Sequence, residues 1–290
     1  MNLIYVIILA VVQGLAELLP VSSSAHVIVV EKLLGLNATS PEMTLLLVML
    51  HTGTMFAVII YFWKQWRETY FQSWQRFWGT AIRFFIATIF TLAVYFAAQE
   101  VIKKTLFRGA PHAEIENLFD RLDLIAPALA AAGVLILVSG LAAKGASGEH
   151  AATATDISTG QASLIGIVQG LCLPFRGFSR SGATISVGML SGVSKISAEA
   201  FSFALAVILT PAVIGREALR LVRAHHEAGA SAGLASAFVP SLLGAVFSFL
   251  AGLLALKWLS QWLEKGRWYL FGIYCLVAAG VVFALYRAGY

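Results

Sequence analysis

The chain has 290 residues, of which 59% are hydrophobic and only 12% are charged, with a net charge of +5. Soluble domains carry about 25% charged residues, so this composition excludes a soluble globular protein and indicates an integral membrane protein with no nucleic-acid partner. Two cysteines, Cys172 and Cys275, are too few for a disulfide framework, and we expect both to be packing residues.

The first 40 residues hold two apolar pieces, Leu3 to Val12 and Val27 to Leu36, which are too short to cross a membrane. Between them lie Glu17 and the stretch Pro20 to Ser24, which reads Pro-Val-Ser-Ser-Ser. We predict two short helices that meet at a break inside the membrane, a re-entrant hairpin whose second helix begins at the serines. The alternative is one kinked spanning helix from Leu3 to Val21.

Six later runs approach the roughly 20 apolar residues that cross a bilayer core of about 30 Å. They are Thr44 to Phe62, Ala81 to Ala98, Leu124 to Ala143, Phe201 to Gly215, Phe238 to Leu256 and Trp268 to Tyr286. Between the third and fourth runs, Ala162 to Leu173 and Gly182 to Val193 repeat the hairpin design. The sequence therefore predicts an all-α membrane protein with six transmembrane helices and two re-entrant helical hairpins. Lys and Arg are shared equally between the two sides, so charge bias does not set the orientation.

A repeated pattern indicates that the chain is a duplicated unit. Residues 168–171 restate the Val-Gln-Gly-Leu of residues 12–15, and residues 179–184 are similar to residues 22–26. The offset is 156 residues at Gln13 and 157 at Ser22, so the copies differ by one inserted residue.

We expect one membrane domain over residues 1–290, built from a first repeat at 1–143 and a second at 161–290. Each repeat holds one hairpin and three spanning helices. Three crossings reverse the chain direction, so the second repeat should be inverted.

The two copies differ in charge. The first has Glu17 and His26, whereas the second has Leu173 opposite Glu17 and gains Arg180. The first hairpin is therefore suited to hold a cation or move a proton, and the second to hold an anion.

In the first hairpin, Gln13 and Glu17 are four residues apart and share one helix face. Ionisable groups at membrane depth are usually functional, although Glu17 could instead be a hydrogen-bonding residue between packed helices. His26 should lie in the first turn of the return helix, either as a functional group or as a neutral imidazole bound to a hydroxyl.

In the second hairpin, Arg180 lies between Ser179 and Ser181, with Gly182 next and Thr184 in the following turn. Forked guanidinium donors, hydroxyls and backbone N–H groups that glycine leaves accessible are suited to phosphate. The alternative is an arginine that extends to lipid headgroups.

Three further ionisable residues give weaker signals. Glu42 and Glu199 are explained as acids in a first helical turn. His51 either hydrogen-bonds to a hairpin or packs in the core.

The stretches Gln13 to His26 and Gly177 to Thr184 closely resemble the two signature motifs of the bacterial undecaprenyl pyrophosphate phosphatase family, also called the bacitracin resistance protein family. The likeness covers essentially the whole chain. It implies dephosphorylation of the C55 isoprenyl pyrophosphate carrier to its monophosphate, with a divalent cation, at a site open to the periplasm of a bacterial inner membrane. The matching family positions are Gln13, Glu17, Ser23, His26, Arg180 and Thr184.

Two positions depart from the family pattern. Gln13 stands at a position that the family fills with Glu or Gln, so it supplies no second carboxylate. Arg176 precedes Gly177 where the family usually has proline. A second guanidinium there could contact the distal phosphate, or it could point to headgroups or pair with an acid.

Together, the residues and the resemblance predict a phosphoryl-transfer enzyme that recycles the lipid carrier for cell-wall synthesis. The predicted catalytic residues are Glu17, Ser23, His26 and Arg180. The predicted phosphate-binding residues are Ser22, Arg176, Ser179, Arg180, Ser181, Gly182 and Thr184. Gln13 and Glu17 are the predicted ligands of Mg²⁺ or Ca²⁺.

The nucleophile stays open among water, Ser23 and His26. The expected partners are the polyprenyl pyrophosphate substrate, membrane lipids and a second copy of the chain in a homodimer. The alternative function is a transporter or flippase for an anionic polyprenyl phosphate lipid, because inverted repeats also serve alternating access.

Overall fold

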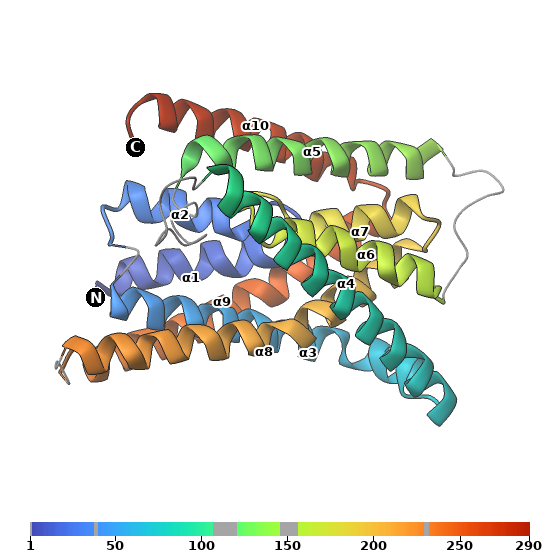
Figure 1. Ribbon diagram of the computed structural model, residues 1–290, viewed down its shortest axis with the longest axis horizontal. Coiled ribbons are helices and arrows are strands. Elements are labelled where there is room, and N and C mark those ends of the chain that lie inside the picture. The colour runs from blue at the N-terminus through green and yellow to red at the C-terminus, as the bar shows by residue number, and fades with distance from the viewer. Residues whose placement is uncertain (1, 38–39, 107–120, 146–155, 229–231) are drawn as a thin grey trace.

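The computed structural model describes residues 2–37, 40–106, 121–145, 156–228 and 232–290, and these residues form helices and no strand (Figure 1). In chain order the helices are α1 (Leu3–Leu18), α2 (Ser23–Leu33), α3 (Pro41–Tyr70), α4 (Trp74–Leu106), α5 (Leu122–Gly145), α6 (Thr159–Cys172), α7 (Arg180–Leu190), α8 (Lys195–Ala228), α9 (Ala232–Glu264) and α10 (Tyr269–Arg287). Two short helices followed by three longer ones therefore occur twice.

Six of the described helices are long and apolar enough to cross a membrane, which confirms the six predicted spans. These apolar lengths are Pro41–Tyr70, Trp74–Thr105, Leu122–Ala143, Lys195–Ala212, Phe238–Glu264 and Tyr269–Arg287. Several continue beyond the predicted bounds because helical hydrogen bonding does not stop where the apolar run does. The chain is thus a multi-pass membrane protein.

The short helices form two hairpins. α1 packs against α2 and α6 packs against α7. The chain reverses after Leu18, so the alternative of a single kinked helix to Val21 is wrong. Figure 1 shows the α1–α2 and α6–α7 hairpins entering from opposite ends and meeting near the middle, as an inverted repeat requires. Their re-entrant position in a membrane and the repeat bounds 1–143 and 161–290 stay predictions.

Each hairpin is held by a long helix of the other repeat. α1 packs along α9, and α6 packs along α4. A Cβ atom on Gly14 would lie 2.6 Å from the carbonyl oxygen of Ser248 in α9, and one on Gly170 would lie 2.5 Å from that of Thr91 in α4. The glycine of the repeated Val-Gln-Gly-Leu pattern is therefore a point of close helix contact in both copies, and in α6 Gly166 approaches α4 as closely.

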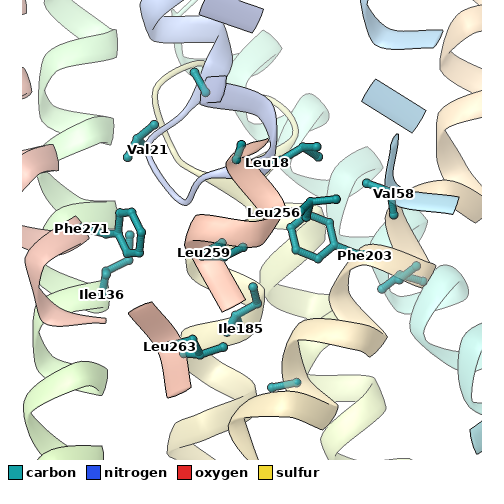
Figure 2. Close-up of a cluster of buried hydrophobic side chains, with 14 of the residues drawn as sticks. Leu18, Val21, Val58, Ile136, Ile185, Phe203, Leu256, Leu259, Leu263 and Phe271 are labelled. Atoms are coloured by element: carbon teal, nitrogen blue, oxygen red, sulfur yellow. The ribbon is translucent and has the colours of Figure 1, made fainter. Parts of the chain in front are cut away.

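The main buried cluster fixes the turn of the first hairpin in place. Figure 2 shows side chains from the turn, from α3 and α8 and from α9 packed together, including Leu18, Val21, Val58, Phe203, Leu256 and Leu259. Because lipid tails are as apolar as these side chains, van der Waals packing and not exclusion from water holds the cluster together. The turn of the first hairpin is therefore packed against a buried apolar cluster.

Three residues outside the two motifs lie where the sequence predicts them. Cys172 and Cys275 are buried free cysteines, as expected of packing residues. Glu42 lies in the first turn of α3, as predicted.

The prediction for Glu199 is wrong. α8 begins earlier, because Ser194 accepts the N–H of Ser197 at 3.2 Å and so caps the helix one turn before Glu199. Glu199 is buried inside the helix and accepts a hydrogen bond from Ser260 Oγ at 2.7 Å.

Candidate active site

The break between α1 and α2 follows from its sequence. Leu19 precedes Pro20, and a residue before proline is pushed into extended conformation, so α1 ends there. Ser22 precedes α2 with φ 69°, the only positive φ at a non-glycine position among the described residues. Such a conformation costs on the order of 1–3 kcal/mol and is typical of functional sites.

The turn of the second hairpin is shaped by Gly177 and Ser179. Gly177 has φ 96°, and a Cβ atom there would lie 2.5 Å from the carbonyl oxygen of Ile125 in α5. Ser179 accepts the N–H of Gly182 at 3.2 Å and caps α7 in the expected way. Arg180 is consequently held at the first position of α7.

The turns of the two hairpins are in direct contact. Arg180 Nη2 donates to Glu17 Oε1 at 3.1 Å, across 163 residues of sequence. The N–H of Gly177 also donates to Ser24 Oγ at 3.4 Å. The Glu17 carboxylate of the first hairpin and the Arg180 guanidinium of the second, which are far apart in the sequence, therefore form one ion pair.

Glu17 is the centre of the site. Its Oε2 accepts from Ser23 Oγ at 2.5 Å and from Gln13 Nε2 at 3.2 Å. His51 Nε2 lies 3.9 Å from the same oxygen, so His51 faces the hairpin rather than the core. The side chain of Glu17 is only 18% exposed, and groups from α1, α2, α3 and α7 converge on it.

His26 is held by different partners. Its Nδ1 lies 2.8 Å from the carbonyl oxygen of Ser22, and its Nε2 lies 2.7 Å from the hydroxyl of Tyr274 on α10. The two rings are stacked, with centroids 5.7 Å apart. Tyr274 was not predicted, because nothing marks one tyrosine as special within an apolar helix 248 residues away.

One arm of the Arg180 guanidinium lacks an acceptor. Its Nη1 is buried and has no hydrogen-bond partner in the described part of the chain. A buried donor without an acceptor costs about 1–3 kcal/mol, and more when charged. An anionic oxygen from a substrate would remove this cost.

The other predicted phosphate ligands surround Arg180 at different depths. Ser179, Ser181 and Thr184 are buried. Thr184 Oγ1 lies 2.8 Å from the carbonyl oxygen of Arg180 and 2.6 Å from Ser202 Oγ, which places its hydroxyl against α8. It therefore supports the first turn of α7 from behind.

The remaining predicted ligands lie in or next to the two turns. Ser22 Oγ is 3.3 Å from Ser24 Oγ, and Gly182 lies against Ile136 of α5. Arg176 is partly buried in the turn before α7. Phosphate binding by all these residues stays a prediction.

The described residues contain no group of three or more His, Cys, Asp and Glu side chains that could hold a metal ion. Gln13 and Glu17 supply two neighbouring oxygen-bearing side chains. Mg²⁺ is commonly held by one or two carboxylates together with substrate phosphates and water. The pair therefore fits a cation whose coordination the substrate completes, and not a closed protein cage.

Comparisons with known proteins place this site in context. The sequence matches the family described as bacitracin resistance protein BacA over residues 6–282. It is 58% identical over 287 residues to a protein named undecaprenyl-diphosphatase 2 from Acinetobacter baylyi, covering 98% of each chain. It is 34% identical to an undecaprenyl-diphosphatase from Desulfosudis oleivorans, with 95% of each chain covered, and 31% identical to one from Rhodopirellula baltica, with 98% of each covered.

Proposed function

The chain belongs to the bacitracin resistance protein family, and from that premise we propose that it hydrolyses undecaprenyl diphosphate to undecaprenyl phosphate and inorganic phosphate. The relatives named undecaprenyl-diphosphatase support this reaction. The observation that carries the proposal is the Glu17–Arg180 pair, in which the guanidinium keeps one buried arm without an acceptor. The product would return to cell-wall synthesis as a lipid carrier.

The phosphates are proposed to lie between the two hairpin turns. Arg180 Nη1 would donate to the diphosphate, while the N-termini of α2 and α7 add the positive ends of their helix dipoles. In a site largely closed to water, such fixed donors stabilise the charge that develops during transfer.

Ser23 is the proposed nucleophile because its hydroxyl donates directly to Glu17 at 2.5 Å. Glu17 would take the hydroxyl proton as Ser23 Oγ bonds to the distal phosphorus and the bond to the bridging oxygen breaks. Undecaprenyl phosphate leaves, and the distal phosphoryl group stays on Ser23. Water would then attack that phosphorus, giving one proton to His26 Nε2, and Ser23 would recover its proton from Glu17.

A divalent cation, Mg²⁺ or Ca²⁺, is part of the proposal. Glu17 would hold it together with the diphosphate oxygens, and the amide oxygen of Gln13 would join them once the amide, which now donates to Glu17 through Nε2, turns over. Its contribution would be to neutralise charge on the phosphates. The protein alone supplies the base, the nucleophile and the guanidinium.

Phosphate release tests the proposal directly. Purified protein in detergent should release inorganic phosphate from a polyprenyl diphosphate, and a chelator should abolish the release. A transporter for the same lipid would show no release and would act only across a sealed bilayer. The phosphatase reading is preferred because the curated relatives carry that activity in their names.

The multi-pass chain is proposed to lie in a bacterial inner membrane with its site facing the periplasm. Membership of the family supports this placement. A reactive label that cannot cross the membrane, applied to a single cysteine placed at the hairpin turns, would test which side is accessible. A homodimer stays a prediction, which light scattering in detergent would test.

A further inference from the structure

We propose that Tyr274 is a positioning residue for His26, holding the imidazole in one tautomer with its Nε2 lone pair directed toward α10. This inference rests on the proposed function only for its kinetic consequence. The contacts themselves concern groups on two helices far apart in the sequence, α2 and α10.

The backbone selects the tautomer. A carbonyl oxygen can only accept a hydrogen bond, so the 2.8 Å contact between His26 Nδ1 and Ser22 O requires a proton on Nδ1. In the neutral imidazole, Nε2 then carries the only lone pair. The same carbonyl oxygen also accepts the backbone N–H of His26 at 3.4 Å, so the first turn of α2 fixes its direction.

The hydroxyl of Tyr274 completes the arrangement. It lies 2.7 Å from Nε2 and donates its proton to that lone pair. The stacked rings, with an interplanar angle of 12°, also fix the plane of the imidazole. Two hydrogen bonds and a ring contact therefore leave His26 one orientation.

The contact between His26 and Tyr274 joins two helices that otherwise pack little on each other. In the second hairpin, α7 packs closely on α5, and Gly182 lies against Ile136. The described residues show no comparable packing of α2 on α10. Tyr274 is 47% exposed, so the phenol can turn aside when water approaches Nε2. Its role is to keep the base oriented until that step.

The substitution Tyr274→Phe isolates the hydroxyl, because it keeps the ring and its stacking. Losing one neutral hydrogen bond that orients a base should lower kcat about threefold to tenfold. KM should stay within about twofold of the parent, since Tyr274 is not proposed to touch the substrate. Tyr286→Phe is the matched control, an exposed tyrosine on the same helix that packs on Phe283.

Ring ¹⁵N spectra of histidine-labelled protein give a readout that does not depend on activity. The His26 signals, assigned by their loss in His26→Gln, should show a protonated Nδ1 in the parent protein. Tyr274→Phe should move the Nε2 signal, and Tyr286→Phe should not. A parent protein with its proton on Nε2 overturns the inference without any variant.

The outcomes separate this inference from the proposed function. Lower kcat with a shifted Nε2 signal supports the positioning role. Unchanged kcat and Nε2 in an active protein overturn it, and a rise in KM alone also overturns it by assigning Tyr274 to substrate contact. If the parent releases no phosphate, the proposed function fails and the Nε2 signal alone decides the role of Tyr274.

Discussion

Ser22 and Ser179 occupy equivalent positions in the two hairpins, and each is the residue just before a short helix. Ser179 has φ −60° and its hydroxyl caps α7, whereas Ser22 has φ 69° and makes no side-chain cap to α2. One hairpin thus has a relaxed helix start and the other a strained one. Strain of this kind persists where the surroundings impose a functional geometry.

The same division extends through both motifs. Ser23 aligns with Arg180, and His26 aligns with the fully buried Ala183. The second hairpin is pressed against α5 and presents one guanidinium, while the first carries the carboxylate, the hydroxyl and the imidazole. In the proposed function, the two hairpins therefore separate charge stabilisation from the groups that move protons.

Replacing Arg180 should have the largest effect, because it removes the guanidinium that the second hairpin contributes. Arg180→Ala should lower kcat/KM about 10²- to 10³-fold, because a fixed donor to the developing charge is lost. Arg180→Lys should remain poor, since an ammonium lacks the planar fork. Phosphate release under saturating cation measures the effect, and Arg287→Ala at the exposed end of α10 is the control. Near-parent activity in Arg180→Ala would remove Arg180 from the site.

Removing the opposite charge tests the first hairpin. Glu17→Gln keeps the size of the side chain but loses the base for Ser23 and the partner of Arg180, so we expect roughly a hundredfold loss of kcat/KM. The Mg²⁺ concentration for half-maximal rate should rise as well. If that concentration is unchanged, Glu17 is not a cation ligand.

The two substitutions should also interact. Residues that act as one unit show non-additive losses, so adding Glu17→Gln to Arg180→Ala should cost much less than it costs alone. Fully additive losses would show that the two hairpins act independently.

The fit of the second hairpin on α5 is tested by Gly177→Ala. The added methyl would meet the Ile125 carbonyl at 2.5 Å in a conformation with φ 96°, so the unfolding free energy should fall by about 2 kcal/mol. Thermal unfolding in detergent measures it. Gly35→Ala is a useful control, because Gly35 has φ 64° but open space around it. A matching loss in both variants would assign the effect to φ alone.

The smallest effects should have opposite signs at the equivalent serines. Ser22→Gly relieves the positive φ and should stabilise the protein by up to about 1 kcal/mol. Ser179→Ala loses a helix cap and should destabilise it by about 1 kcal/mol. Unfolding curves that shift in the same direction would contradict the contrast between the two helix starts.

The sequence alone predicted the features that local patterns encode. The six spans follow from apolar length, and the hairpins follow from short apolar pieces around Pro20 and the serines. The partnership of Glu17 with Arg180 was approachable because both motifs sit at equivalent places in a repeat. The spans and the hairpins are encoded within about 20 neighbouring residues each, and the repeat is visible because two such short patterns recur 156–157 residues apart.

Other features depend on how distant helices meet. Tyr274 resembles any tyrosine in an apolar helix, and only packing brings its hydroxyl to His26. His51 faces the first hairpin because α3 packs beside α1, and the sequence does not show this packing. The acid Glu199 suggests the start of α8, but Ser194 caps the helix one turn earlier. The first two of these features depend on tertiary contacts, on which local sequence patterns give no information.

The exchange of supporting helices between repeats has a consequence for biosynthesis. Gly14 of α1 lies against Ser248 of α9, a residue made about 230 positions later, which at 5–20 residues per second is roughly 10–50 s of translation. Until then the first hairpin lacks the helix that holds it. Glu17 must also wait for Arg180 as its counter-charge. The nascent chain therefore carries an unfinished polar hairpin through most of its synthesis, and a ribosome stalled before α9 leaves a product without a completed site.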